Sequence, residues 1–347
     1  MVKNLNEIDT VGRWFIEFEK RNECCDGIFG IYDSNNCIPQ IRLYPHARYD
    51  GYSVMNEYLR ELGEKDLPDH LKNTTSRKMP SLYKQVILFF KFLTTLPLRP
   101  HSRKMKLKIN GWPKNPLATK RERIAWRIFD KYDSEKILAF SKKNNSTLNS
   151  HLIAKLINSI NPIWANKKNK IIAGVTVSLH KNLGFDPKPG NKFSTIDIWL
   201  DESTSPYDIN LKIKNNLKRR MHIASWISYH LPKYIGSWFY GYFLLMIDFV
   251  QNRNIVFTNV GKWEAGSGKS IFLIPPVFHH NPISIGVITW EEKLSIAIQF
   301  HPHLEIDLDS IENIIENWSK ELLCKDAIQY IESSRNINDL NIMDIDL

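Results

Sequence analysis

The sequence predicts an α/β protein with two lobes, a sandwich of mixed β-sheets with flanking helices. Three observations support this fold class. At 347 residues the chain exceeds the usual size of one domain. Its 43% hydrophobic and 24% charged content is that of globular proteins, which excludes wholesale disorder. Strand-like and helix-like patterns are interspersed in both halves, and no internal repeat is evident.

The first part of the chain predicts a helix, a hairpin and a second helix. Apolar residues at helical spacing indicate an amphipathic helix over 4–22. Turn formers at 33–36 separate strands at 27–32 and 38–44, as is typical of a β-hairpin. Ser53 is placed to cap the next helix.

The second half is dominated by strands. Apolar runs predict them at 123–130, 170–179, 193–200, 254–261, 270–277, 283–290 and 294–300, the last two as a pair. Helices are expected at 133–145, 147–160, about 207–250 and 307–323. The aromatic run 235–250 suits a core helix, an acyl tunnel wall or an interfacial segment.

This pattern divides the chain into four parts. We expect a partial N-terminal lobe at 1–68, a basic amphipathic linker at 69–121, a C-terminal lobe at 122–325 and a loosely attached tail at 326–347. The isolated or adjacent cysteines indicate reduced thiols, and the start lacks an apolar signal region. A cytoplasmic protein is therefore expected.

Positive charge is concentrated in one segment. Residues 70–121 hold 13 Lys or Arg and no acid, whereas the whole chain has a net charge of +10. This segment surrounds the apolar run 85–93, which suits a peripheral position on anionic headgroups at the inner face of a membrane. A solvated basic linker is the alternative. Nucleic-acid binding is not favoured, because no helix-turn-helix or interleaved aromatic and basic pattern occurs.

One short motif carries residues suited to acid–base chemistry. His46, Asp50 and Gly51 form HxxxDG on the loop between the hairpin and the next helix. A neutral imidazole, with a pKa of about 6.5, accepts a proton from an alcohol or amine at physiological pH. Asp50 is expected to brace the loop, and Gly51 to permit a tight turn. An ordinary surface loop is the alternative, because short motifs often occur by chance.

Several segments resemble one acyltransferase superfamily in the same order along the chain. IRLYPHARYDGYSVMNEYLREL is similar to the HHxxxDG segment of chloramphenicol acetyltransferases, peptide synthetase condensation domains, plant HxxxD acyltransferases and wax ester synthase/diacylglycerol acyltransferases. Residues 135–160 resemble the paired helices that open the C-terminal lobe, and 175–195 resemble a strand followed by a Gly-Asn turn. FTNVG at 257–261 resembles the crossover of the wax ester synthase branch. The resemblance implies a chloramphenicol acetyltransferase-like fold.

It also implies direct acyl transfer from an acyl-CoA or acyl carrier protein thioester, with no covalent acyl-enzyme, metal or other cofactor. His46 would remove the proton of a hydroxyl or amine acceptor, and Asp50 and Gly51 would be structural. Thr258 or Asn259 would stabilise the oxyanion, with a structural asparagine at a strand end as the alternative. A catalytically inactive scaffold protein of this fold at the membrane surface is the alternative function.

Three departures from the family pattern bear on this expectation. Pro45 stands in place of the motif's first histidine, and no arginine can be assigned to the usual pairing with Asp50. The family also has a much longer segment before the motif. The N-terminal lobe is therefore expected to be shortened, or completed by a partner chain.

Two further motifs are assigned to structure. GSGKS at 266–270 has Trp263 where a P-loop needs its first glycine, and a strand pattern follows, so we expect a hairpin turn. Two pairs of neighbouring histidines could together bind a metal, but no carboxylate lies at recognisable metal-ligand spacing, so we expect them to be solvated or hydrogen-bonded. They are His279, His280, His301 and His303.

Overall fold

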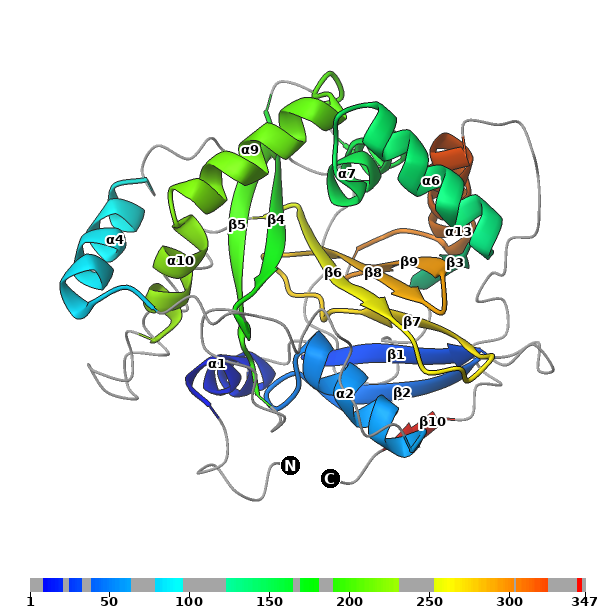
Figure 1. The fold of residues 1–347 in the computed structure, drawn as a ribbon, viewed down its shortest axis with the longest axis horizontal. Helices are drawn as coiled ribbons and strands as arrows, with labels where there is room; N and C mark the ends of the chain where they lie inside the picture. Colours follow the sequence, from blue (N-terminus) through cyan, green and yellow to red (C-terminus); the bar gives the residue numbers. More distant parts are fainter. Residues whose placement is uncertain are drawn as a thin grey trace.

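The computed structural model describes residues 9–20, 25–32, 39–63, 79–95, 123–164, 169–180, 190–230, 253–302, 304–323 and 342–344. Figure 1 shows two sheets that lie against each other, with helices around them. One sheet has four strands and the other has six, and each contains both parallel and antiparallel neighbours. The predicted α/β class with mixed sheets is confirmed.

The four-stranded sheet is built on the expected hairpin. Strand β1 (Asp26–Tyr32) pairs antiparallel with β2 (Gln40–Pro45), while 33–38 lie outside the described residues. The other edge of β1 pairs with β7 (Ser270–Ile274), which comes from far along the chain. Of the expected tail, β10 (Ile342–Asp344) pairs parallel with β2. The sequence pattern did not indicate either of these long-range pairings.

Two short helices lie beside this sheet. Helix α1 (Thr10–Glu19) starts at an N-cap formed by Asp9. Helix α2 (Gly51–Glu61) is capped by Asp50, whose side chain accepts from the Ser53 amide at 2.8 Å. The predicted Ser53 cap is therefore wrong, because the carboxylate three residues earlier takes that position. Helix α2 buries Val54, Met55 and Tyr58 against the sheet.

The six-stranded sheet forms the larger core. Its order is β3 (Ile124–Ile128), β9 (Lys293–Phe300), β8 (Ile283–Trp290), β6 (Ile255–Trp263), β4 (Ile171–Ser178) and β5 (Phe193–Leu200). The predicted pair β8 and β9 is confirmed as an antiparallel hairpin. Its turn residues Glu291 and Glu292 adopt positive φ, which suits the twist of a two-residue hairpin.

Helices cover this sheet on the outside (Figure 1). They are α6 (Lys131–Lys143), α7 (Leu148–Ser159), α9 (Pro206–Lys218), α10 (Met221–His230) and α13 (Leu308–Leu323), with a 3-10 turn at Asn161–Ile163. The helix expected over 207–250 breaks at Arg220, which has a φ of 58°. Residues 231–252, which include the whole aromatic run 235–250, lie outside the described residues. Helix α4 (Leu82–Thr95) packs beside α10.

The two sheets meet where β7 crosses β8. A Cβ on Gly286 of β8 would lie 1.5 Å from the Leu273 carbonyl oxygen of β7, so only glycine allows this contact. The loop carrying GSGKS joins β6 of the six-stranded sheet to β7 of the four-stranded sheet, and these two strands do not pair with each other. The hairpin turn expected there is wrong. The Gly268 amide of this loop donates to the Glu291 carboxylate at 3.0 Å, and β7 follows directly.

The described histidines near the end of the chain are not all exposed. His280 and His301 are buried, whereas His303 lies outside the described residues. Within the described ranges, no group of three or more His, Cys, Asp or Glu side chains is placed to hold a metal ion.

Candidate active site

His46 follows β2 directly and is held at both its backbone and its ring. Its amide donates to the Cys25 carbonyl at 3.1 Å, and its Nδ1 lies 2.5 Å from the Tyr49 carbonyl oxygen. A carbonyl can only accept, so Nδ1 carries the proton and Nε2 carries the lone pair. The ring contacts two phenylalanines, with centroids 4.4 Å from Phe15 and 5.4 Å from Phe193, on which it stacks. The backbone and the ring contacts together fix the orientation of this imidazole.

The surroundings of His46 favour its neutral form. Burial lowers the pKa of the ring below 6.5, and this effect outweighs the opposing hydrogen bond to the Tyr49 carbonyl and the charges of Asp50, Asp9 and Asp26. The imidazole is therefore unprotonated at neutral pH. A neutral ring with a free Nε2 lone pair has the state that a general base requires.

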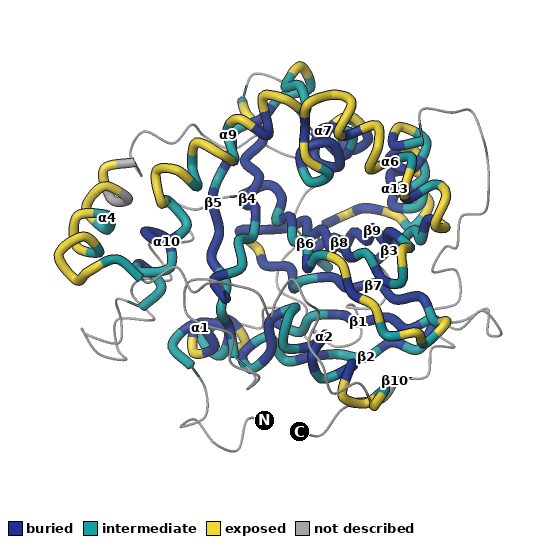
Figure 2. The backbone as a smooth tube through the Cα atoms, in the orientation of Figure 1, coloured by how far each residue is buried: buried dark blue, intermediate teal, exposed yellow. Residues whose placement is uncertain are grey.

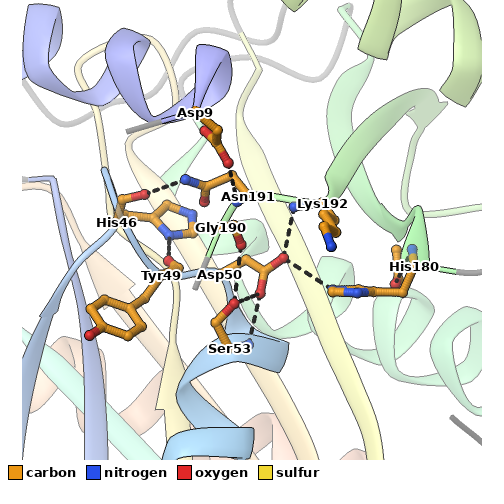
Figure 3. Close-up of polar contacts among 10 residues, drawn as sticks. Asp9, His46, Tyr49, Asp50, Ser53, His180, Gly190, Asn191 and Lys192 are labelled. Atoms are coloured by element: carbon orange, nitrogen blue, oxygen red, sulfur yellow. Dashed lines mark hydrogen bonds and ion pairs between the residues drawn. The ribbon is translucent and has the colours of Figure 1, made fainter. Parts of the chain in front are cut away.

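Asp50 is buried and binds several donors at once (Figure 3). Its Oδ1 accepts from the Ser53 amide at 2.8 Å and the Ser53 hydroxyl at 2.9 Å. Its Oδ2 accepts from the Lys192 amide at 2.9 Å and lies 3.3 Å from His180 Nε2. Burial alone would raise the pKa of Asp50, but the bonds from His180, Lys192 and Ser53 lower it overall. The carboxylate is ionised. It links the start of α2 to the segment 190–192, which leads directly into β5.

The segment 190–192 holds the motif loop from the opposite side. The Gly190 carbonyl accepts from the Ser53 hydroxyl at 3.1 Å. The Asn191 side-chain amide donates to the His46 carbonyl at 2.9 Å, and the Asn191 backbone amide donates to Asp9 at 2.6 Å. Figure 3 shows these contacts converging on the loop. This segment therefore fixes both His46 and the start of α1.

Gly51 is required by a close contact rather than by a special turn. Its φ is not in the positive range. A Cβ at this position would lie 2.5 Å from Cγ1 of Val260 on β6. Val260 is itself buried, so α2 can approach the second sheet only with glycine here. The expectation that Gly51 permits a tight turn is therefore wrong, and the close packing against Val260 explains the glycine instead.

Thr258 and Asn259 lie on β6 and differ in what their side chains bind. The Thr258 hydroxyl is 2.9 Å from the hydroxyl of Thr176 on the neighbouring strand β4. Asn259 donates to Asn149 at 2.6 Å and accepts from the Gly261 amide at 2.8 Å, where the pairing of β6 with β8 shifts register. Asn259 thus stabilises an irregular strand, and it lies within β6 rather than at a strand end. Thr258 retains a hydroxyl that can turn toward a ligand.

A cavity of about 150 Å³ joins these residues. His46, Asp50, Gly51, Thr258 and Asn259 all line it, so the structure brings together every site residue that the sequence suggested. Its wall is largely apolar and includes Trp14, Phe15 and Phe18 from α1, and Phe193 and Phe278 from elsewhere. Such a cavity suits a mostly apolar ligand oriented by a few polar groups.

The cavity also has a charged group in its wall. Arg253 is buried, binds Asp197 at 2.6 Å and donates to the Thr195 hydroxyl at 2.8 Å. Because the guanidinium already pairs with a carboxylate, the two charges largely compensate each other. Arg253 therefore shapes the wall without making the cavity strongly cationic.

Sequence reasoning missed His180 and Asn191 as supports of the site. His180 takes the place beside Asp50 for which no arginine could be assigned. The sequence predicts the Gly-Asn turn at 190–191 but not its contact with His46. Both residues lie far from the motif in sequence, and no spacing rule links them to it.

Comparison with known sequences gave no match. No family model matches the chain. A search of curated proteins also found none that matches.

Comparison with solved structures did give matches. The epimerization domain from the third module of tyrocidine synthetase B matches with a TM-score of 0.52 and 14% identity, covering 82% of this chain and 67% of that one. The condensation domain from Monacolin K polyketide synthase has a TM-score of 0.51 and 11% identity, covering 80% and 67%. Trichothecene 15-O-acetyltransferase from Fusarium sporotrichioides has a TM-score of 0.54 and 12% identity, covering 78% and 64%.

This chain therefore spans about two thirds of the length of each of these proteins. At such identities the likeness concerns the fold. The chain has the two-lobed α/β fold of condensation and chloramphenicol acetyltransferase-like domains.

Proposed function

We propose that this protein is an acyltransferase that moves an acyl group from a CoA or carrier-protein thioester to a hydroxyl or amine. The observation that carries the proposal is the state of His46. Its Nδ1 proton is bound by the Tyr49 carbonyl, and its Nε2 has no hydrogen-bond partner among the described residues. The ring is neutral and lines an apolar cavity, where a general base acts on a ligand shielded from water.

The proposed reaction needs no covalent acyl-enzyme. Nε2 of His46 takes the proton from the acceptor hydroxyl or amine while its oxygen or nitrogen attacks the thioester carbonyl carbon. The carbonyl electrons move onto oxygen and form a tetrahedral oxyanion. This intermediate collapses, the carbon–sulfur bond breaks, and the imidazolium returns its proton to the leaving thiolate. The products are an ester or amide and a free thiol.

The oxyanion needs a hydrogen-bond donor, and Thr258 is the better of the two candidates. Its hydroxyl lines the cavity and can rotate, and Thr176 can donate to its oxygen in turn. The amide of Asn259 is already used between Asn149 and Gly261. Asp50 and Gly51 act by positioning, since the first is bound within the protein and the second is a packing residue.

The choice of substrates follows from the aromatic wall and the likeness to other proteins. Trp14, Phe15 and Phe18 favour an apolar acyl chain or a lipid-like acceptor, in keeping with the sequence resemblance to the wax ester synthase branch. Two of the matched structures are domains of a peptide synthetase and a polyketide synthase. A carrier-protein thioester is therefore proposed beside acyl-CoA.

A free-thiol assay tests the proposal. The protein is incubated with short-chain and long-chain acyl-CoA, or with acylated carrier protein, and with alcohols and amines. We expect thiol release that depends on the acceptor. Absence of release with both donor types, across the acceptor panel, would instead favour the catalytically inactive scaffold.

We further propose that the segment 70–121 places the enzyme on an anionic membrane surface at the cytoplasmic face. Only 79–95 of this segment is described, and Figure 2 shows α4 largely exposed. Five large apolar side chains of α4 are 46 to 75% exposed: Leu82, Tyr83, Val86, Ile87 and Phe90. Surrounding basic residues each contribute about 1 kcal/mol near an anionic surface. None of the described helices is long and apolar enough to cross a bilayer.

Vesicle binding tests this placement. Replacing Arg103, Lys104, Lys106 and Lys108 by Gln should weaken binding to vesicles containing anionic lipid, while turnover of soluble substrates stays near that of wild type. Binding of the wild type should weaken as salt rises. A variant that binds vesicles normally but loses affinity for CoA or carrier protein would assign the charge to the donor instead.

A further inference from the structure

The loop between β7 and β8 forms one wall of the cavity through a tight turn. The Phe278 amide donates to the Asn281 carbonyl at 3.1 Å, and the Asn281 amide donates to the Phe278 carbonyl at 2.9 Å. Residues paired in this way project their side chains to the same side. Both side chains line the cavity, and His279 and His280 form the turn between them.

The side-chain oxygen of Asn281 lacks a hydrogen-bond donor among the residues that the structure describes. The residue is 5% exposed, and its Oδ1 is buried without a hydrogen bond to any described residue. Buried Asn254, by contrast, accepts from the Ile172 amide at 2.9 Å. A buried amide oxygen without a donor destabilises a fold, and native proteins keep few of them. The position of Asn281 therefore points to a donor supplied by a ligand.

Aromatic side chains lie between the proposed base and Asn281 along one wall of the cavity. The Phe278 ring lies 5.8 Å from Phe15, and Phe15 lies 4.4 Å from the His46 ring. His280 stacks on Phe278 at 5.5 Å and closes the wall beside Phe18. An aromatic surface thus runs from the proposed base toward the Asn281 amide.

We propose that Asn281 is a specificity residue that binds a second polar group of the acceptor, a hydroxyl or an amine N–H. The acceptor class is a molecule with two such groups joined by an apolar body, for which one group reacts at His46 and the other donates to Asn281. The assignment of this ligand as an acceptor rests on the proposed function. The hydrogen-bonding site itself does not, because it follows from the cavity and the unpaired amide.

The first test measures thermal unfolding without ligand. Asn281→Leu removes the polar atoms at similar size, and we expect it to melt at or above the wild-type temperature, since it removes an unsatisfied group. Asn254→Leu is the matched control, which should melt lower because it breaks an existing bond. An Asn281→Leu variant that melts well below wild type would overturn the proposal by making Asn281 a structural residue.

The second test measures binding of two probes through the rise in melting temperature that they cause. The probes are a decanediol with a hydroxyl at each end and the matching decanol with only one. We expect wild type to bind the diol about tenfold or more tightly than the decanol, and Asn281→Leu to lose this preference. A wild type that responds to neither probe, or equally to both, would overturn the proposal. Diol preference in a protein without thiol release would leave Asn281 assigned and remove only the acyltransferase function.

Discussion

Replacing Asp50 by alanine is expected to destabilise the protein and lower its activity together. The carboxylate binds the Ser53 amide and hydroxyl, the Lys192 amide and the His180 ring. Loss of the helix cap costs about 0.5–2 kcal/mol, and each buried donor left unsatisfied costs about 1–3 kcal/mol. Effects within one network do not add fully, so we expect about 3–5 kcal/mol in total, as for other broken buried pairs.

Urea unfolding at several pH values measures this effect and its cause. Because the pKa of Asp50 is lowered on folding, its charge stabilises the protein fully above the unfolded pKa of 3.8 and progressively less as pH falls through the folded pKa. The difference in unfolding free energy between wild type and Asp50→Asn should therefore narrow below pH 3.8. An Asp50→Ala variant with wild-type stability but no activity would refute the bracing role. A difference that stays constant at low pH would refute the role of the charge.

Three further perturbations test neighbouring parts of the site. In urea unfolding, Gly51→Ala should lose about 1–3 kcal/mol of unfolding free energy by overpacking, and adding Val260→Ala should restore most of it. The control Gly27→Ala, where the added Cβ would make only ordinary contacts, should change the unfolding free energy little. Lack of rescue by Val260→Ala would contradict the contact between Gly51 and Val260. Thr258→Val should lower kcat about 10²–10³-fold with little change in KM, and Thr258→Ser should retain activity in the thiol assay; an unchanged kcat would remove Thr258 from the oxyanion site. The kcat/KM profile should fall with decreasing pH through a pKa below 6.5, since His46 must be neutral to act; an acid limb centred above 6.5 would contradict that assignment.

The elements with strong local signals could be predicted from the sequence. The hairpin of β8 and β9 and the helix α13 follow from alternation, helical spacing and turn residues. The placement of β7 could not be predicted in this way. Its run SIFLI indicates a buried strand, but local pattern does not say which strand it pairs with, and it joins β1 of the other sheet. The contact that permits this crossing depends on Gly286, a residue with no distinctive local signal.

The candidate site was predictable where its residues lie within one motif. His46, Asp50 and Gly51 are close in sequence, and their residue types indicated acid–base chemistry on a loop. The reason for Gly51 was not predictable, because it depends on Val260 in a distant strand. The same holds for His180 beside Asp50, since the two residues meet only in the folded chain. Local patterns thus indicated the proposed general base, while the residues that support it required the tertiary structure.

The most direct measurement of the central claim compares thiol release by wild type and His46→Ala, with the unfolding free energy of each. A general base contributes about 10²–10⁴-fold, so we predict a loss of that size with little change in stability. His279→Ala, at an exposed histidine, is the control and should keep wild-type turnover. Thiol release by His46→Ala at the wild-type rate, with the same donor and acceptor, would contradict the assignment of His46 as the base.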